Sequence, residues 1–368
     1  MKLMKAVMVT AIILTVFSTI SVCLAQNDKR SYQLLNMPGG NVTYELNVVV
    51  PEALQEYYGG KSHRLASSDD FSNFVTPYAL KPIADNLWKI YENDEDFTNG
   101  ALMLVHQITY AETMPSEYPA ETIVNNKGDC DLFAFIAASI LKAGGLDAVL
   151  LYYENQAHMN IGVHLLSAPT DVRTSAFSVT HNGVRYYVAE CTGGNWADGW
   201  RVGECPSELK KVTAKVITLE NSEQVAPGQV SASFTALNAS SLSLEVSPTI
   251  ALQKTVITVR GQLAPEISNK NVTLYVQVNN SPWTTIGTAT TKPNGRFEYV
   301  LTTDAAGIYT IRASWSGDEL YTGAISSANS ATVIPLFLGA LVAVAILAAV
   351  IGAIAVLMSK HAQQPPEV

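Results

Sequence analysis

Hydrophobic and polar positions follow different patterns in different parts of the chain. Between about residues 26 and 219, apolar residues recur at helical spacing in some segments and at every second position in others. From residue 244 to 332, short β-branched and aromatic runs are separated by Pro, Gly, Asn and Asp. These patterns predict an α+β domain at 26–219 and an all-β domain at 244–332.

Helical patterns precede most strand patterns in the predicted α+β domain. The helical patterns lie around residues 74–91, 98–110 and 130–143, and Gly144-Gly145 ends the third. Strand patterns follow at residues 147–154, 158–165 and 183–190. The predicted order is therefore a helix followed by an antiparallel run of strands.

The strand pattern at 158–165 separates two kinds of side chain. Its apolar positions are Met159, Ile161, Val163 and Leu165, and the alternate positions are His158, Asn160, Gly162 and His164. We expect the apolar set to be buried and the histidines to lie on a polar face or at a cleft. His158 begins the strand, so it is the better placed to lie at a cleft edge.

The all-β region contains about seven strand-like runs. They lie at residues 244–248, 255–261, 272–278, 284–291, 296–303, 307–315 and 331–333. Even spacing and turn residues between the runs predict a sandwich that resembles the immunoglobulin-like modules of microbial surface proteins. The segment 220–243 is rich in Ser and Ala and poor in charge, which predicts a linker with room for a short strand.

Apolar segments near both termini predict export and membrane anchoring. Lys2 and Lys5 precede an apolar stretch that ends in small residues at Ala25, typical of a signal peptide at 1–25, with an uncleaved anchor as the alternative. Residues 333–358 carry no charge and are long enough for one transmembrane helix. Lys360 follows, so we expect a cytoplasmic tail at 359–368 and an extracellular body in a single-pass cell-membrane protein.

Composition narrows the class of partner. The formal net charge is −9, and the exported part has no cluster of Lys or Arg. Nucleic acid is therefore not expected as a partner, because nothing would neutralise its phosphates. Four N-x-S/T sequons, at Asn41, Asn238, Asn271 and Asn279, are compatible with glycosylation outside the membrane.

Cys130 is one of 4 cysteines among 368 residues, and it stands where the third helical pattern begins. A thiol attacks as its thiolate, and the free N–H groups of a helix N-terminus stabilise that anion. Gly128 is expected to let the chain turn sharply into the helix. The position makes Cys130 a candidate nucleophile.

A base and an acid for this thiol follow later in the chain. His158 is the candidate base, and Glu190 ends the next strand pattern. A carboxylate that accepts the proton on Nδ1 of His158 would fix its tautomer and stabilise its imidazolium form. Cys130, His158 and Glu190 are therefore the predicted catalytic residues.

Four short motifs resemble the transglutaminase-like superfamily, most closely its archaeal and bacterial membrane-associated members. They are YPAET at 118–122, GDCD at 128–131, HMNIGV at 158–163 and YYVAECT at 186–192. The resemblance covers roughly residues 40–210 and implies a papain-like fold. It also implies a Cys, His, Asp/Glu triad in that chain order, with Cys130 as nucleophile, His158 as general base and Glu190 as orienting acid.

Other polar groups leave alternatives open. Cys191 and Cys205 are expected to form a disulfide in an exported protein, with two free buried thiols as the alternative and a zinc site including His158 as a third reading. The acidic stretch at 92–100 reads as a turn in which Asp96 or Thr98 caps the next helix, with calcium binding as the alternative. No cofactor and no metal is predicted.

The sequence leaves open the second oxyanion donor and the roles of the two acids that flank Cys130. The second oxyanion donor is open between Gln107 and Asn126. Asp129 and Asp131 suit the first turn of a helix, yet their charges would oppose formation of a thiolate beside them. We expect both carboxylates to point away from the sulfur.

The sequence thus predicts a membrane-anchored extracellular thiol enzyme that acts on amide bonds of a protein or peptide at the cell surface through a thioacyl intermediate. Release by water would make a cysteine peptidase or amidase, and release by an amine would make a protein cross-linker; family habit favours water. The alternative is a surface binding or adhesion protein in which the same fold is only a scaffold.

Overall fold

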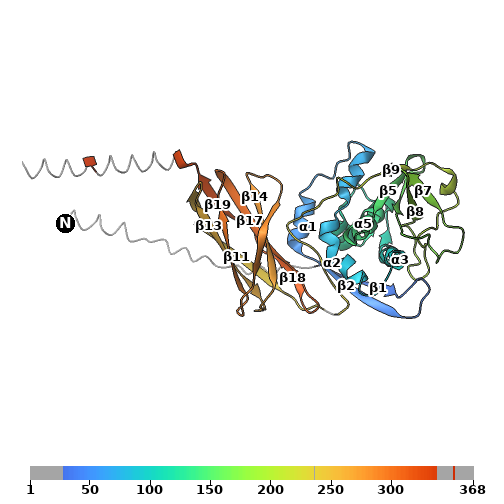
Figure 1. Cartoon of the computed structure of the whole chain (residues 1–368), viewed down its shortest axis with the longest axis horizontal. Coiled ribbons are helices and arrows are strands. Elements are labelled where there is room, and N and C mark those ends of the chain that lie inside the picture. Colours follow the sequence, from blue (N-terminus) through green and yellow to red (C-terminus); the bar gives the residue numbers. More distant parts are fainter. Residues whose placement is uncertain (1–27, 236, 338–350, 353–368) are drawn as a thin grey trace, which may run out of the picture.

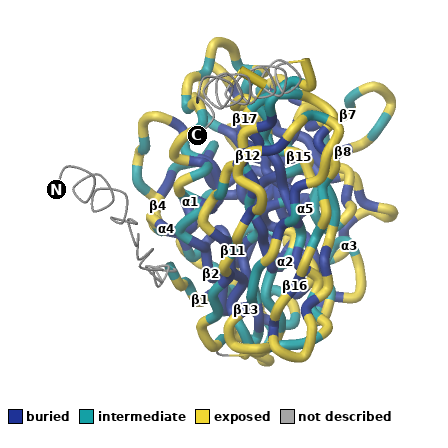
Figure 2. The backbone as a smooth tube through the Cα atoms, turned by 90° about the vertical axis from the view of Figure 1, so that its left-hand side faces the viewer, coloured by how far each residue is buried: buried dark blue, intermediate teal, exposed yellow. Residues whose placement is uncertain are grey.

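The computed structural model describes residues 28–235, 237–337 and 351–352, and they form an α+β domain followed by an all-β domain (Figure 1). Each domain has its own large hydrophobic core, and Figure 2 shows buried backbone in the interior with exposed backbone around it. The predicted signal peptide at 1–25 and tail at 359–368 lie outside the described residues. So does most of the predicted span at 333–358, and within the described residues no helix is both long and apolar enough to cross a membrane.

The first domain combines α-helices with two main sheets. Its helices are α1 (Glu52–Gly59), α2 (Pro77–Leu87), α3 (Asp94–Val105), α4 (Pro119–Asn125) and α5 (Cys130–Ala143). One sheet has the order β7 (Ser178–His181), β8 (Val184–Ala189), β6 (His158–Val163), β5 (Ala148–Tyr153) and β9 (Lys215–Ile217), with every neighbouring pair antiparallel. The other contains β1 (Asp28–Leu35), β2 (Thr43–Val50) and β10 (Ser231–Ser233).

The helix predicted at 130–143 and the alternation predicted for β6 are both confirmed. α5 carries ten consecutive buried residues, and the apolar positions of β6 pack with it in the first core. The opposite face of β6 is less polar than expected, because a second hydrophobic cluster containing Val149 and Val188 covers that side of the sheet. Asn160 and Gly162 are therefore buried, while His164 is exposed.

The second helix begins earlier than predicted. α3 starts at Asp94, and Asn93 caps it by accepting a hydrogen bond from the backbone N–H of Asp96 at 2.9 Å. The expected cap at Asp96 or Thr98 is wrong, because the Asn93 amide also donates to the Asp96 carboxylate and so closes the turn one residue before the helix.

The all-β domain is a sandwich of two sheets, as predicted, and it fits an immunoglobulin-like module. One sheet has the order β11 (Ser241–Ser247), β13 (Val256–Ala264) and β16 (Arg296–Thr302). The other has the order β12 (Ile250–Leu252), β19 (Asn329–Ile334), β17 (Gly307–Gly317), β14 (Asn271–Val278) and β15 (Thr284–Thr290), with β18 (Thr322–Ile325) on β17. β19 ends at Ile334, so the first two positions of the predicted span belong to the sandwich.

The segment 220–243 is not a free linker. Ala226 and Val230 are buried in the first core, and β10 pairs with β2. Glu223 lies near its start and accepts hydrogen bonds from Tyr57 at 2.8 Å and Tyr58 at 2.6 Å, and from Lys61 at 2.5 Å. The low charge of this segment therefore reflects its burial.

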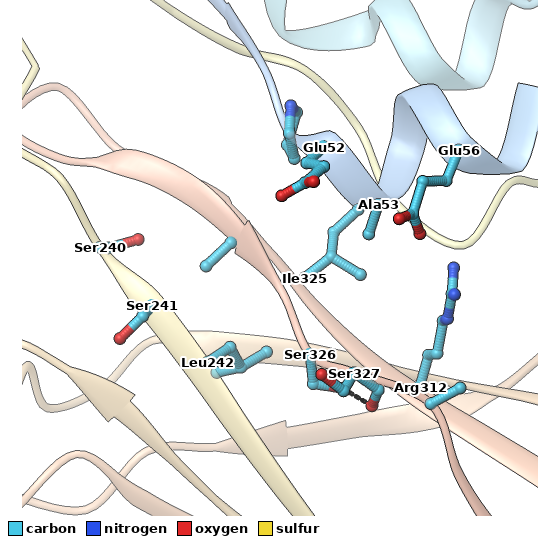
Figure 3. A pocket seen from close by; sticks show the side chains of 13 residues that line it. Glu52, Ala53, Glu56, Ser240, Ser241, Leu242, Arg312, Ile325, Ser326 and Ser327 are labelled. Carbon is cyan, nitrogen blue, oxygen red and sulfur yellow. Dashed lines mark hydrogen bonds between the residues drawn. The ribbon is translucent and has the colours of Figure 1, made fainter. Parts of the chain in front are cut away.

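Polar contacts also join the two domains. Gln229 donates to the Tyr78 carbonyl oxygen at 2.8 Å and accepts from the Ser316 hydroxyl at 2.5 Å. A cavity of about 310 Å³ lies between α1 and the strands β17 and β18, where Glu56 and Arg312 face each other (Figure 3). Burial lowers the pKa of Arg312, and the Glu56 charge opposes that shift.

Replacing Glu223 by Ala should destabilise the first domain. The change leaves the buried Tyr58 hydroxyl without its acceptor, which costs about 2 kcal/mol of unfolding free energy. Urea unfolding followed by tryptophan fluorescence measures this loss. Glu220→Ala, at an exposed position of the same segment, is the matched control and should change the free energy by less than about 0.5 kcal/mol. Equal effects of the two changes would contradict the role given to Glu223.

Candidate active site

Cys130 is the first residue of α5 and is partly exposed, while the helix behind it is buried. The preceding strand β4 (Lys127–Gly128) pairs with β3 (Thr109–Tyr110) and directs the chain into the helix. Gly128 does not have a positive φ, so the turn into the helix needs no left-handed backbone there. A β-carbon there would lie 3.0 Å from Leu132 Cβ and 3.2 Å from Thr122 Cγ2, so lack of space favours glycine.

His158 and Glu190 meet at neighbouring strand ends. β6 pairs with β8 so that Ile161 lies opposite Ala189, which brings the residue after β8 beside the start of β6. His158 Nε2 lies 2.9 Å from Glu190 Oε2. The expected contact through Nδ1 is wrong, because the ring approaches the acid with Nε2 and leaves Nδ1 on the side away from it.

The thiol completes a row of three groups. His158 is hydrogen-bonded to Glu190 and lies close enough to Cys130 for the two side chains to interact, and the Cys130 thiol lies 3.8 Å from the Ala157 carbonyl oxygen. Burial lowers the pKa of His158, but these hydrogen bonds and charges outweigh it and raise the pKa to about 10. The raised pKa favours the imidazolium form of His158.

Glu190 is completely buried and fully hydrogen-bonded. Its Oε1 accepts from the Thr192 backbone N–H at 2.9 Å and from the Thr192 hydroxyl at 2.6 Å, while Asn160 Nδ2 lies 3.4 Å from Oε2. Burial raises the pKa of Glu190, but the contacts with His158 and Thr192 lower it by a larger amount, so the net shift is downward. The acid is therefore ionised where it meets the imidazolium.

His164, on the same strand pattern as His158, and the acid Asp198 have partners outside this row. His164 is exposed, and its Nδ1 lies 3.0 Å from the Arg185 carbonyl oxygen. Asp198 forms ion pairs with Arg201 at 3.0 Å and Arg173 at 3.6 Å. The structure therefore brings together the three residues predicted from sequence, Cys130, His158 and Glu190.

His106 belongs to the site although its sequence context, near the end of a helix, gave no sign of this. It is buried, and its Nε2 donates to the Glu190 carbonyl oxygen at 3.1 Å. Burial lowers the pKa of His106, while the contacts with Glu190 oppose the shift. His106 is therefore a neutral donor that holds the backbone of the acid. Asn160, by contrast, shares the strand face of His158, a signal that could have found it.

The two candidates for a second oxyanion donor are not supported by their contacts. The Gln107 amide bonds the backbone N–H and carbonyl of Gln33, both at 2.8 Å, and so joins α3 to β1. Asn126 ends α4 in a left-handed conformation. Tyr110, which the sequence pattern did not single out, pairs with Gly128, is 59% exposed and lies close enough to Cys130 for their charges to interact.

Cys191 and Cys205 are both free, so the predicted disulfide is wrong. Cys191 packs in the first core with α5, whereas Cys205 packs in the cluster on the other side of the sheet. The sheet therefore separates the two sulfurs. Burial raises the pKa of both thiols, that of Cys205 to about 11. Within the described residues, no group of three or more His, Cys, Asp or Glu side chains could hold a metal ion.

Comparisons with known proteins add little to this geometry. No family model and no curated protein matches the chain. Among solved structures, the PKD domain of an M14-like peptidase from a Thermoplasmatales archaeon is similar, with 19% sequence identity over 27% of this chain and 98% of that chain. The TM-score of that match is 0.20.

Both buried cysteines should be recovered as free thiols. We expect alkylation in denaturant, without reductant, to label the peptides that contain Cys191 and Cys205 once each, because the sheet keeps the sulfurs apart. Peptide mass spectrometry measures the labels, and a sample reduced before alkylation is the control. A disulfide-linked peptide pair in the unreduced sample would contradict the separation.

Proposed function

We propose that this chain is a transglutaminase-like thiol enzyme that acts on amide bonds as a cysteine peptidase or amidase. The observation that carries the proposal is the row formed by Cys130 at the start of α5, His158 and the buried Glu190. A helix that carries the thiol, followed in the chain by antiparallel strands that carry base and acid, supports assignment of the first domain to the papain-like core. The four sequence motifs point to the same family.

The chemistry follows from the charges in this row. The Cys130 thiolate attacks an amide carbonyl carbon, and the negative oxygen is stabilised by the backbone N–H groups at the N-terminus of α5. The His158 imidazolium then gives its proton to the leaving nitrogen, and the carbon–nitrogen bond breaks. A thioester on Cys130 and a free amine result.

The second half of the reaction regenerates the thiol. Neutral His158 takes a proton from water, the hydroxide attacks the thioester, and the acid leaves as the sulfur departs. Glu190 stabilises the imidazolium each time it forms. An amine in place of water would give acyl transfer, and protonation of the ring would proceed in the same way. No cofactor takes part in this scheme.

We further propose that the enzyme works outside the cell on protein or peptide substrates. The apolar segments at 1–25 and 333–358 support export and a single C-terminal anchor in the cell membrane. The sandwich would then stand between that anchor and the first domain. The chain has no basic cluster, which argues against nucleic acid as a substrate.

Alkylation of the full-length protein in detergent solution tests the nucleophile. At about pH 6.5, iodoacetamide should modify Cys130 at least tenfold faster than a free thiol, because His158 stabilises the thiolate. His158→Ala should slow the modification by about 10²-fold. The rates are measured by mass spectrometry of the Cys130 peptide.

His164→Ala is the matched control for this experiment. It removes a histidine from the same strand pattern, but one that is exposed and bonded to Arg185, so the rate should not change. If wild-type Cys130 were modified no faster than a free thiol, this result would contradict the proposed enzymatic function. It would favour a non-catalytic surface binding or adhesion protein.

Removal of the Glu190 charge should shift the pH dependence of the same reaction. The raised pKa of His158 means that its protonated form contributes stability that is complete below about pH 6.5 and is lost as the pH rises through about 10. In Glu190→Gln, His158 should lose its proton at a lower pH than in the wild type. Alkylation near pH 6.5 should therefore fall by about 10²-fold and recover in alkali.

Circular dichroism should show that Glu190→Gln remains folded. Glu204→Gln is the matched control, because Glu204 is also a buried acid but pairs with Arg173 at 2.6 Å. That variant should lower the unfolding temperature without slowing alkylation. An unchanged profile in Glu190→Gln would remove Glu190 from the mechanism.

A further inference from the structure

Two carboxyl groups hold the loop at residues 111–116 beside the candidate nucleophile. Asp129 Oδ2 accepts a hydrogen bond from the Thr113 backbone N–H at 3.0 Å. Asp131 Oδ2 accepts one from the Ser116 hydroxyl at 3.1 Å. These carboxyls come directly before and after Cys130, so both ends of the loop segment are tied to the first turn of α5.

One oxygen of this arrangement lacks a donor. Asp129 Oδ1 is fully buried, and among the described residues no N–H or O–H group reaches it. A buried acceptor without a donor is unfavourable, and more so when it is charged. The neighbouring Asp131 carboxyl interacts with Asp129, and it can supply a hydrogen to Asp129 only if it carries a proton.

The surroundings favour that proton. Burial raises the pKa of Asp131 to about 7, and the hydrogen bond with Asp129 and the Asp129 charge act in the same direction, while the Ser116 hydroxyl opposes them. The titratable groups beside the pair are Tyr110 from β3, Glu112 from the loop and Cys130 from α5. Burial raises the pKa of Tyr110, and the charges of Cys130, Asp129, Glu112 and Asp131 raise it further, so these surroundings are acidic.

We propose that Asp131 shares a proton with Asp129 and that this acid pair is a positioning device, which holds the loop 111–116 against α5 for the reaction at Cys130. We call this acid pair, with its bonds to Thr113 and Ser116, the clamp. Its purpose rests on the proposed function, but its existence can be tested independently of that function. Asp131 acts through Asp129, Thr113 and Ser116, so it is a positioning residue.

The loop carries apolar groups that would border a substrate. Tyr110 precedes it and is 59% exposed, and Met114 lies between the two tied residues and is 91% exposed. Tyr110 also lies close enough to Cys130 for their charges to interact, so a substrate that approaches the thiol would meet the Tyr110 side chain. Loss of the clamp would release the loop 111–116 and leave the thiol, His158 and Glu190 in place.

The sign of the pH effect follows from the raised pKa of Asp131. The proton stabilises the folded state fully below about pH 4, and this contribution is lost as the pH rises through about 7. Two adjacent buried negative charges then repel each other. The loop should therefore be held in mild acid and released in mild alkali.

Hydrogen exchange of the full-length protein in detergent solution tests the clamp. Protection of residues 111–116, relative to intrinsic rates, should fall by roughly tenfold between about pH 5.5 and pH 8.5 in the wild type. Asp131→Asn should stay protected at both pH values, because its amide donates to Asp129, accepts from Ser116 and does not titrate. Asp131→Ala should lose protection at both.

Asp147→Asn is the matched control, because Asp147 accepts from the Tyr186 hydroxyl at 2.9 Å in another part of the domain. In this variant, protection of residues 111–116 should fall as the pH rises, as it does in the wild type. Equal wild-type protection at both pH values, or a fall in Asp131→Asn, would overturn the clamp. Alkylation of Cys130 in the same samples distinguishes the proposed enzyme from the proposed clamp. An unreactive thiol together with a pH-dependent loop would contradict the enzymatic function and still support the clamp.

Discussion

The buried charge of Glu190 imposes the tightest constraint on this molecule. An ionised carboxylate that leaves water costs several kcal/mol unless donors surround it. Here one oxygen accepts twice from Thr192, and the other meets His158. His106 binds the carbonyl oxygen of the same residue from 84 positions away in the chain. Pairing this charge therefore fixes the ends of β6 and β8, the ring of His158 and the contact with the region after α3.

The central sheet makes such burial possible because both of its faces are covered. α5 and its neighbours pack on one face, and a smaller cluster around Val149 and Val188 packs on the other. This two-sided cover buries the polar residue Asn160 next to the acid. It also places Cys191 and Cys205 in separate apolar environments, where thiols are stable as neutral groups. The partly exposed cysteine is Cys130, at the helix end where charge is tolerated.

The first domain is completed by chain that follows it in sequence. β10 adds to β2 only after the chain has left the central sheet, and Glu223 binds Tyr57, Tyr58 and Lys61 on the way. The same segment then meets the sandwich, where Gln229 bonds with Ser316. Glu56 and Arg312 face each other across the neighbouring cavity (Figure 3). Charge and hydrogen bonding thus couple the two domains through side chains of both.

Local patterns determined much of this structure. The helical spacing after residue 130, the alternation along β6 and the short β-branched runs of the sandwich each need only about ten neighbouring residues, so the sequence alone predicted α5, the buried face of β6 and an all-β domain. The candidate residues Cys130, His158 and Glu190 came from the same patterns and from motif resemblance. Tertiary structure alone decided that Nε2 of His158 meets the acid, that His106 joins them and that the two other cysteines stay apart. These outcomes depend on strand register and on which face of a sheet another element covers, and such contacts join residues far apart in the chain.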